Sequence, residues 1–214
     1  MPAHDRLVVT QLFTQKAALL EAFGRDGHLQ GADLSFVEIR AIDFAGISLA
    51  GAVIVGSRLY DCNLAGCDLT EVHIQESLLS GVSFARARMD HAFCQRSQFL
   101  GCDFSDVTLT HARLMLCNLE GTPFCRALLT SAQILSSNLS QADLTGASLQ
   151  RASLRESTLE GARFVGCDLS GVDFRKSSFQ DAHYERVVTS GAIFYGKSPS
   201  SAAVCTIATW RGVT

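Results

Sequence analysis

The sequence predicts an all-β solenoid, a four-sided parallel β-helix of about 8 coils with a capping α-helix at its N-terminal end. Three observations lead to this prediction. A large apolar residue recurs at every fifth position, a small residue stands two places before it, and glycine is concentrated two places after it.

The large apolar position runs from Leu29 to Phe194 without an insertion or deletion, and of its 34 members only Thr189 is clearly polar. On an α-helix, steps of five residues rotate by about 140° and would spread these side chains around the whole circumference. On a flat strand, an odd step would place successive members on opposite faces. The chain must therefore turn a corner after every five residues, so that each large side chain points toward a shared axis.

The small and corner positions agree with this geometry. All 33 residues of the small position, from Ala32 to Ala192, are Ala, Ser, Val, Cys, Ile or Thr. Of the 17 glycines, 14 fall at the corner position, where a positive φ is often required. The small position also holds Cys62, Cys67, Cys102, Cys117 and Cys167, and Cys94 occupies a large position. We interpret these cysteines as small buried hydrophobes in a reducing compartment, rather than as a disulfide framework or metal ligands.

Aromatic residues reveal how many sides the coil has. Six of eight large positions spaced by twenty residues are aromatic: Phe44, Phe84, Phe104, Phe124, Phe164 and Tyr184. A period of twenty predicts four repeats per coil and a stack of rings along one inner face.

Several segments resemble the A(D/N)LXX motif of pentapeptide-repeat proteins, among them Ala142-Asp143-Leu144 and Cys167-Asp168-Leu169. The resemblance covers residues 29–194 and implies a four-sided right-handed β-helix with the small and large positions both inside. The best-known members of this family protect DNA gyrase and topoisomerase IV from quinolones by imitating duplex DNA.

We expect three segments: an N-terminal helical cap (1–26), the repeat domain (27–196) and a C-terminal cap or tail (197–214). Residues from about Asp5 to Phe23 suit an amphipathic helix that closes the end of the solenoid, with Leu12, Leu19, Leu20 and Phe23 on one side and Gly24 as its stop. A partner-binding role is the alternative for this helix. Ser198-Pro199 resembles a helix start, so the C-terminal segment could form a short capping helix or a homodimerisation patch.

Composition and motifs exclude several functions. The net charge of −3 argues against direct nucleic-acid binding, and no apolar run is long enough to cross a membrane, so we expect a cytoplasmic protein. The sequence has no recognisable catalytic arrangement, phosphate loop or cofactor motif, so we expect no enzyme, no cofactor and no metal. Glu71, His91 and His111 share one corner class, and we interpret them as solvated corner residues rather than as metal ligands.

The outward residues carry the functional prediction. Nine large apolar side chains fall on one face: Phe36, Val53, Val55, Phe93, Met115, Leu116, Leu135, Ile193 and Tyr195. Such a stripe is usually covered by a partner protein, a second copy or the chain's own terminal segments. The sequence therefore favours a protein-interaction scaffold that binds its partner along this face. The alternative is a DNA mimic that binds a type II topoisomerase, as the family resemblance implies. The repeat region contains 18 acidic and 13 basic residues, which is mildly acidic with no dominant stripe.

Overall fold

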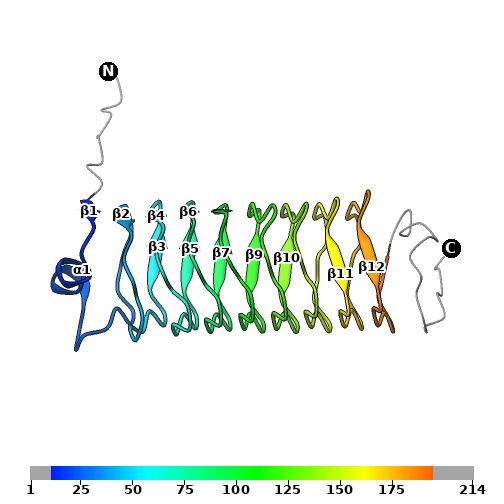
Figure 1. The fold of residues 1–214 in the computed structure, drawn as a ribbon, viewed down its shortest axis with the longest axis horizontal. Helices are drawn as coiled ribbons and strands as arrows, with labels where there is room; N and C mark the ends of the chain where they lie inside the picture. The colour runs from blue at the N-terminus through cyan, green and yellow to red at the C-terminus, as the bar shows by residue number, and fades with distance from the viewer. Residues whose placement is uncertain (1–10, 195–214) are drawn as a thin grey trace, which may run out of the picture.

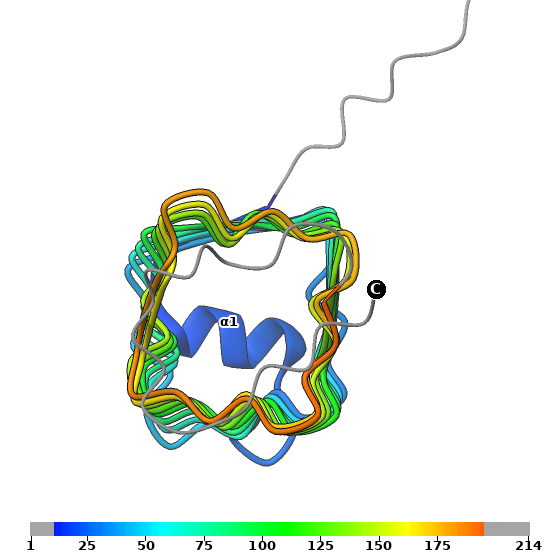
Figure 2. The same ribbon diagram turned by 90° about the vertical axis from the view of Figure 1, so that its right-hand side faces the viewer.

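A computed structural model describes residues 11–194, and these form a four-sided parallel β-solenoid with one helix near the N-terminus (Figures 1 and 2). One sheet contains β1 (Gln11–Phe13), β2 (Val37–Arg40), β4 (Arg58–Tyr60), β6 (Leu78–Ser80) and β8 (Gln98–Leu100). A second sheet contains β3 (Val53–Val55), β5 (His73–Gln75), β7 (Phe93–Gln95), β9 (Arg113–Met115) and β10 (Gln133–Leu135). The strands β11 (Arg163–Val165) and β12 (His183–Glu185) form a third, smaller sheet, and the helix is α1 (Lys16–Phe23).

Strand pairing confirms the coil of twenty residues. Val53 pairs in parallel with His73, and His73 with Phe93. Isolated bridges extend the same register toward the C-terminal end, as far as the pair Asp173–Ile193. Each coil therefore lies directly above the previous one, and residues twenty positions apart form columns along the rod.

The interior of the rod is built as the repeat predicts. The large position is almost completely shielded from solvent through the middle of the solenoid. The predicted ring stack is confirmed, since the ring centroids of Phe84 and Phe104 lie 4.7 Å apart and those of Phe104 and Phe124 lie 5.1 Å apart. Leu144 interrupts the stack, which resumes with Phe164 and Tyr184 at 4.9 Å.

The cysteines of the small position lie in this core, as expected. Burial raises the pKa of the Cys67 thiol to about 11 and that of the Cys102 thiol to about 12. The Cys167 thiol donates to the carbonyl oxygen of Leu144 at 2.9 Å, one coil below. These thiols thus pack and donate weak hydrogen bonds, and they remain protonated at neutral pH.

The N-terminal end differs from its prediction. We expected a helix from about Asp5 to Phe23, but α1 begins only at Lys16, and Gln11–Phe13 form the strand β1; residues 5–10 lie outside the described residues. This strand pairs with β2 and buries Phe13 in the core, whereas Leu12 is 54% exposed and does not share the buried side of the helix. The prediction failed because the spacing of apolar residues carries no information about backbone pairing. An added strand at the end of a solenoid gains hydrogen bonds from the sheet that it extends.

The capping role of the helix is confirmed. Leu19 is fully buried, and Leu20 and Phe23 pack against the core cluster. Seen along the rod, α1 crosses the open end of the square (Figure 2). The helix stops at Gly24, whose N–H donates to the Leu20 carbonyl at 2.8 Å, and a β-carbon at that position would lie only 2.5 Å from the same oxygen. The predicted C-terminal cap or tail, 197–214, lies outside the described residues.

Within residues 11–194, α1 is the only helix, and it is too short to cross a lipid bilayer.

Leu119 is fully buried near the middle of the rod. We predict that two substitutions of this residue, one that leaves a cavity and one that buries a charge, differ in their effect on folding. Leu119→Ala should lower the free energy of unfolding by about 2–5 kcal/mol, because it removes buried methyl groups and leaves a cavity. Leu119→Asp should prevent folding, since an unpaired buried carboxylate costs an amount comparable with the whole stability of a domain. Chemical denaturation followed by circular dichroism measures both effects. A soluble, cooperatively folded Leu119→Asp protein would contradict the inward placement.

Candidate protein-interaction face

The outward side of the second sheet forms a continuous face along the rod. Its first column consists of residues joined by parallel pairing: Asp33, Val53, His73, Phe93, Arg113, Gln133, Ser153, Asp173 and Ile193. Its second column contains Val55, Gln75, Gln95, Met115 and Leu135, joined in the same way. We call these columns, their continuation toward each end and the two flanking rows of corner residues the β3–β10 face.

The eight predicted apolar residues that the structure describes lie on this face, but they do not form one unbroken stripe. Phe36, Val53 and Val55 gather toward the N-terminal end, where Phe36 is 52% exposed and its ring lies over Gly56. A β-carbon on Gly56 would come within 2.7 Å of that ring. His73 and Gln75, on the next coil, separate this N-terminal group from the rest.

A central apolar group contains Phe93, Met115, Leu116 and Leu135, on three successive coils. Met115 and Leu135 are paired neighbours in the sheet, and Leu116 at the adjoining corner is 48% exposed. Ile193 is also exposed, at 45%, but it lies beyond a charged band. Tyr195, the ninth predicted residue, lies outside the described residues. The central group therefore contains more of the predicted residues, four, than the N-terminal group, which contains three.

Two shallow hollows flank the central group. We call the first the histidine hollow; His73, His91, Phe93, His111 and Arg113 line it together with neutral polar residues. The imidazole rings of His91 and His111 stack, with their centroids 5.3 Å apart. The ring centroids of His73 and Phe93 lie 5.9 Å apart. Sequence reasoning placed His91 and His111 at one corner but did not anticipate that they would line a depression beside Phe93. Among residues 11–194, no group of three acidic, histidine or cysteine side chains is placed to hold a metal ion.

We call the second the arginine hollow; it is lined by Arg151, Arg155, Ser131, Ser136, Met115 and Leu135, with further residues including His111 and Glu156. His111 and Gln133 line both hollows, so the two adjoin. The face thus combines an apolar centre with a histidine-rich side and an arginine-rich side.

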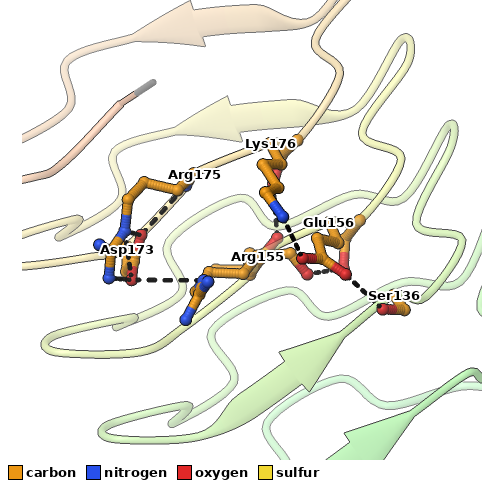
Figure 3. A network of polar contacts seen from close by, with 9 residues as sticks. Ser136, Arg155, Glu156, Asp173, Arg175 and Lys176 are labelled. Carbon is orange, nitrogen blue, oxygen red and sulfur yellow. Dashed lines mark hydrogen bonds and ion pairs between the residues drawn. The ribbon is translucent and has the colours of Figure 1, made fainter. Parts of the chain in front are cut away.

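A charged network borders the arginine hollow on its C-terminal side (Figure 3). Asp173 accepts from Arg175 at 2.6 Å, and this contact lowers the pKa of the Asp173 carboxyl group. Glu156 accepts from Lys176 at 3.1 Å, which lowers the pKa of Glu156 in the same way. Arg155 lies between these pairs, 3.9 Å from Asp173.

Buried hydroxyl groups fix the corner beside the face. The Ser77 hydroxyl donates to the Ile54 carbonyl oxygen at 3.1 Å and accepts from the Ser57 N–H at 3.0 Å. Equivalent contacts recur at this corner in both halves of the solenoid, at Ser57, Ser97, Ser137 and Ser157. Sequence analysis counted these serines only as small residues. In the structure they form a ladder that satisfies backbone groups where the chain leaves the face.

The repeat itself matches a known family. The sequence profile of pentapeptide repeats matches in eight copies, which together span residues 28–183. The chain belongs to the pentapeptide-repeat family. None of the curated proteins compared with it matches in sequence.

Solved structures of pentapeptide-repeat proteins share the fold. A trypsin-treated variant of QnrB1, a plasmid-mediated fluoroquinolone resistance protein, matches with a TM-score of 0.56 and 15% identity, over 78% of this chain and 84% of that one. Full-length QnrB1 matches with a TM-score of 0.52 and 18% identity, over 86% of this chain and 89% of QnrB1. HetL from the cyanobacterium Nostoc sp. strain PCC 7120 is 22% identical over 85% of this chain and 92% of HetL, with a TM-score of 0.38. These comparisons indicate no enzymatic family.

We predict that Ser77→Ala lowers the free energy of unfolding by about 1–3 kcal/mol, because it leaves the buried Ser57 N–H without an acceptor. Thermal and chemical denaturation measure this loss. Ser80→Ala is the matched control, since Ser80 is only half-buried on β6 and makes no side-chain hydrogen bond within the described residues. We expect the control to change stability by less than about 0.5 kcal/mol. Equal losses in the two variants would show that the ladder contributes nothing specific.

Proposed function

We propose that this protein is a non-enzymatic scaffold that docks a partner protein along the β3–β10 face. The observation that carries the proposal is the central apolar group, Phe93, Met115, Leu116 and Leu135, bordered by two hollows lined mostly by residues of polar type. An apolar centre within a polar, hydrogen-bonding rim is the usual anatomy of a protein-binding surface. Aromatic residues, methionine and arginine, which are enriched in such surfaces, all occur here.

The backbone of the sheet supports docking through side chains. Its strands pair with the coils above and below, so the middle of the face has no open strand edge for a partner to extend. A partner must therefore recognise the two outward columns and the corner rows. Because those columns run straight along the rod, the face suits a partner that lies lengthwise on it.

A DNA mimic that binds a type II topoisomerase is the second candidate. The excess of acidic residues in the repeat region and the fold shared with QnrB1 support it. The placement of the acids favours it less, because several are neutralised by an arginine one coil away. Asp68 lies 2.7 Å from Arg88, and Asp106 lies 2.6 Å from Arg126. A DNA mimic needs unneutralised negative charge to meet a basic surface.

We predict that the double variant Phe93→Asp, Met115→Asp loses partner capture while it keeps the β-sheet circular dichroism of the parent chain. Two carboxylates in the centre of the docking surface would have to be buried without partners. Affinity capture from lysate of the source cells, followed by quantitative mass spectrometry, measures the loss. The control is Leu100→Asp, Leu128→Asp, since both leucines are exposed on other sides of the rod. If the first variant retains the same bound proteins as the parent, the docking face is wrongly placed.

For the second candidate, we predict that micromolar protein does not restore supercoiling by purified DNA gyrase in the presence of a fluoroquinolone. The acidic excess of the repeat region is small and forms no dominant stripe, and acids such as Asp68 and Asp106 are paired with arginines, so the rod is a poor match for the charge of duplex DNA. A gel-based supercoiling assay with and without the drug measures this directly. Dose-dependent protection would establish the second candidate in place of the first.

A further inference from the structure

The C-terminal half of the β3–β10 face is positively charged, although the repeat region as a whole is acidic. On its four coils the outward and corner positions carry five cations: Arg113, Arg151, Arg155, Arg175 and Lys176. Only Glu156 and Asp173 are acidic there. This half therefore has a local excess of positive charge on a chain whose net charge is −3.

Within the described residues, the ion pairs of this network leave Arg113 and Arg151 unpaired and Arg155 only weakly paired. Arg175 is held by Asp173 and Lys176 by Glu156. Arg113 and Arg151 make no ion pair or side-chain hydrogen bond with any residue in 11–194. The Nε atom of Arg155 is shielded from solvent and makes no hydrogen bond there, and the nearest carboxylate oxygen, on Asp173, is 3.9 Å away. The two Nη groups of Arg155 are not shielded in this way, so they can donate hydrogen bonds to a bound anion.

Two of these arginines, Arg151 and Arg155, line a hollow that also offers hydroxyl groups and apolar surface. Arg151 and Arg155 line the arginine hollow with the serines Ser131, Ser136 and Ser153. Met115 and Leu135 form the apolar side of its lining. A ligand that fits must therefore present a negatively charged group close to an apolar one.

We propose that the arginine hollow binds an acidic side chain of a partner protein, and that an apolar side chain next to it packs on Met115, Leu116 and Leu135. This inference rests on the proposed docking function and specifies the chemistry of the partner. A carboxylate can accept two parallel hydrogen bonds from a guanidinium group. Such a pair contributes binding energy and also fixes the orientation of the carboxylate. The charge excess would also speed the approach of an acidic segment.

A protein segment fits this surface better than a nucleic acid. A phosphodiester chain would gain from Arg113, Arg151 and Arg155, but its remaining charges would meet a repeat region with five more acids than bases. Its backbone also has no apolar group to place on Met115 and Leu135. A peptide with an acidic and an apolar residue close together satisfies both parts of the hollow.

The test selects peptides from a random phage-displayed library on the immobilised full-length chain, with the Arg151→Gln, Arg155→Gln variant used to remove unrelated binders. We expect the selected peptides to carry Asp or Glu beside a large apolar residue. The best peptide, labelled with a fluorophore, is then titrated by fluorescence polarisation. Its affinity should fall about tenfold or more in the double variant and should weaken as salt rises. A version of the peptide with Gln or Asn in place of its acidic residues should bind equally weakly to both proteins.

Arg88→Gln is the matched control, because Arg88 is an exposed arginine on another side of the rod, paired with Asp68. It should leave peptide affinity unchanged, and thermal melting should show all variants folded. The inference is wrong if no peptide distinguishes parent from double variant, if selected peptides lack acidic residues, or if a duplex oligonucleotide binds more tightly than the peptide. In those cases the docking face can still stand, since its own test is the loss of capture in the Phe93→Asp, Met115→Asp variant.

Discussion

The stacking of each coil on the one twenty residues before it is the constraint on which the rest of the structure depends. Because Val53 pairs with His73 and His73 with Phe93, every outward residue has a fixed neighbour above and below. The stacking makes the core continuous, as the ring spacing of 4.7 Å between Phe84 and Phe104 shows. It also places residues twenty positions apart in columns on the surface, so that the sequence determines which outward side chains are neighbours. Function in such a rod follows from which side chains share a column.

The strict period of five made the solenoid predictable, because no ordinary helix or flat strand can bury that pattern. The N-terminal end was less predictable, because there the repeat has not yet begun. Leu12 fits the apolar side of a helix by spacing, yet the structure exposes it and buries Phe13 in a strand that pairs with β2. The hydrogen bonds offered by the end of an existing sheet outweighed the local helical pattern. Gly24 was recognised correctly as the stop, since its close approach to Leu20 excludes a side chain.

Assigning residues to faces from the sequence identified the apolar face, but it did not predict that this face is divided into an N-terminal and a central apolar group. Phe36 shares a face with Leu135, but position along the rod separates them, and polar residues lie between. The hollows could not be predicted from the sequence either, because their shape depends on how side chains such as Arg155 lie over neighbouring coils. Ser77 was classed by size alone, and its hydrogen bonds to Ile54 and Ser57 became visible only with coordinates. Chemical type at a small inward position therefore carries information that its volume does not.

The most direct test of this account is a set of electron paramagnetic resonance distances along the first column. One spin label stays at His73, and the second is placed at Gln133, Ser153 or Asp173, with Cys125 and Cys205 replaced by Ser because the other cysteines are buried. If coils of twenty residues stack in register, the mean distance should grow by about 4.8 Å from each pair to the next. Distances that do not rise in equal steps would contradict the column arrangement and, with it, the placement of the docking face.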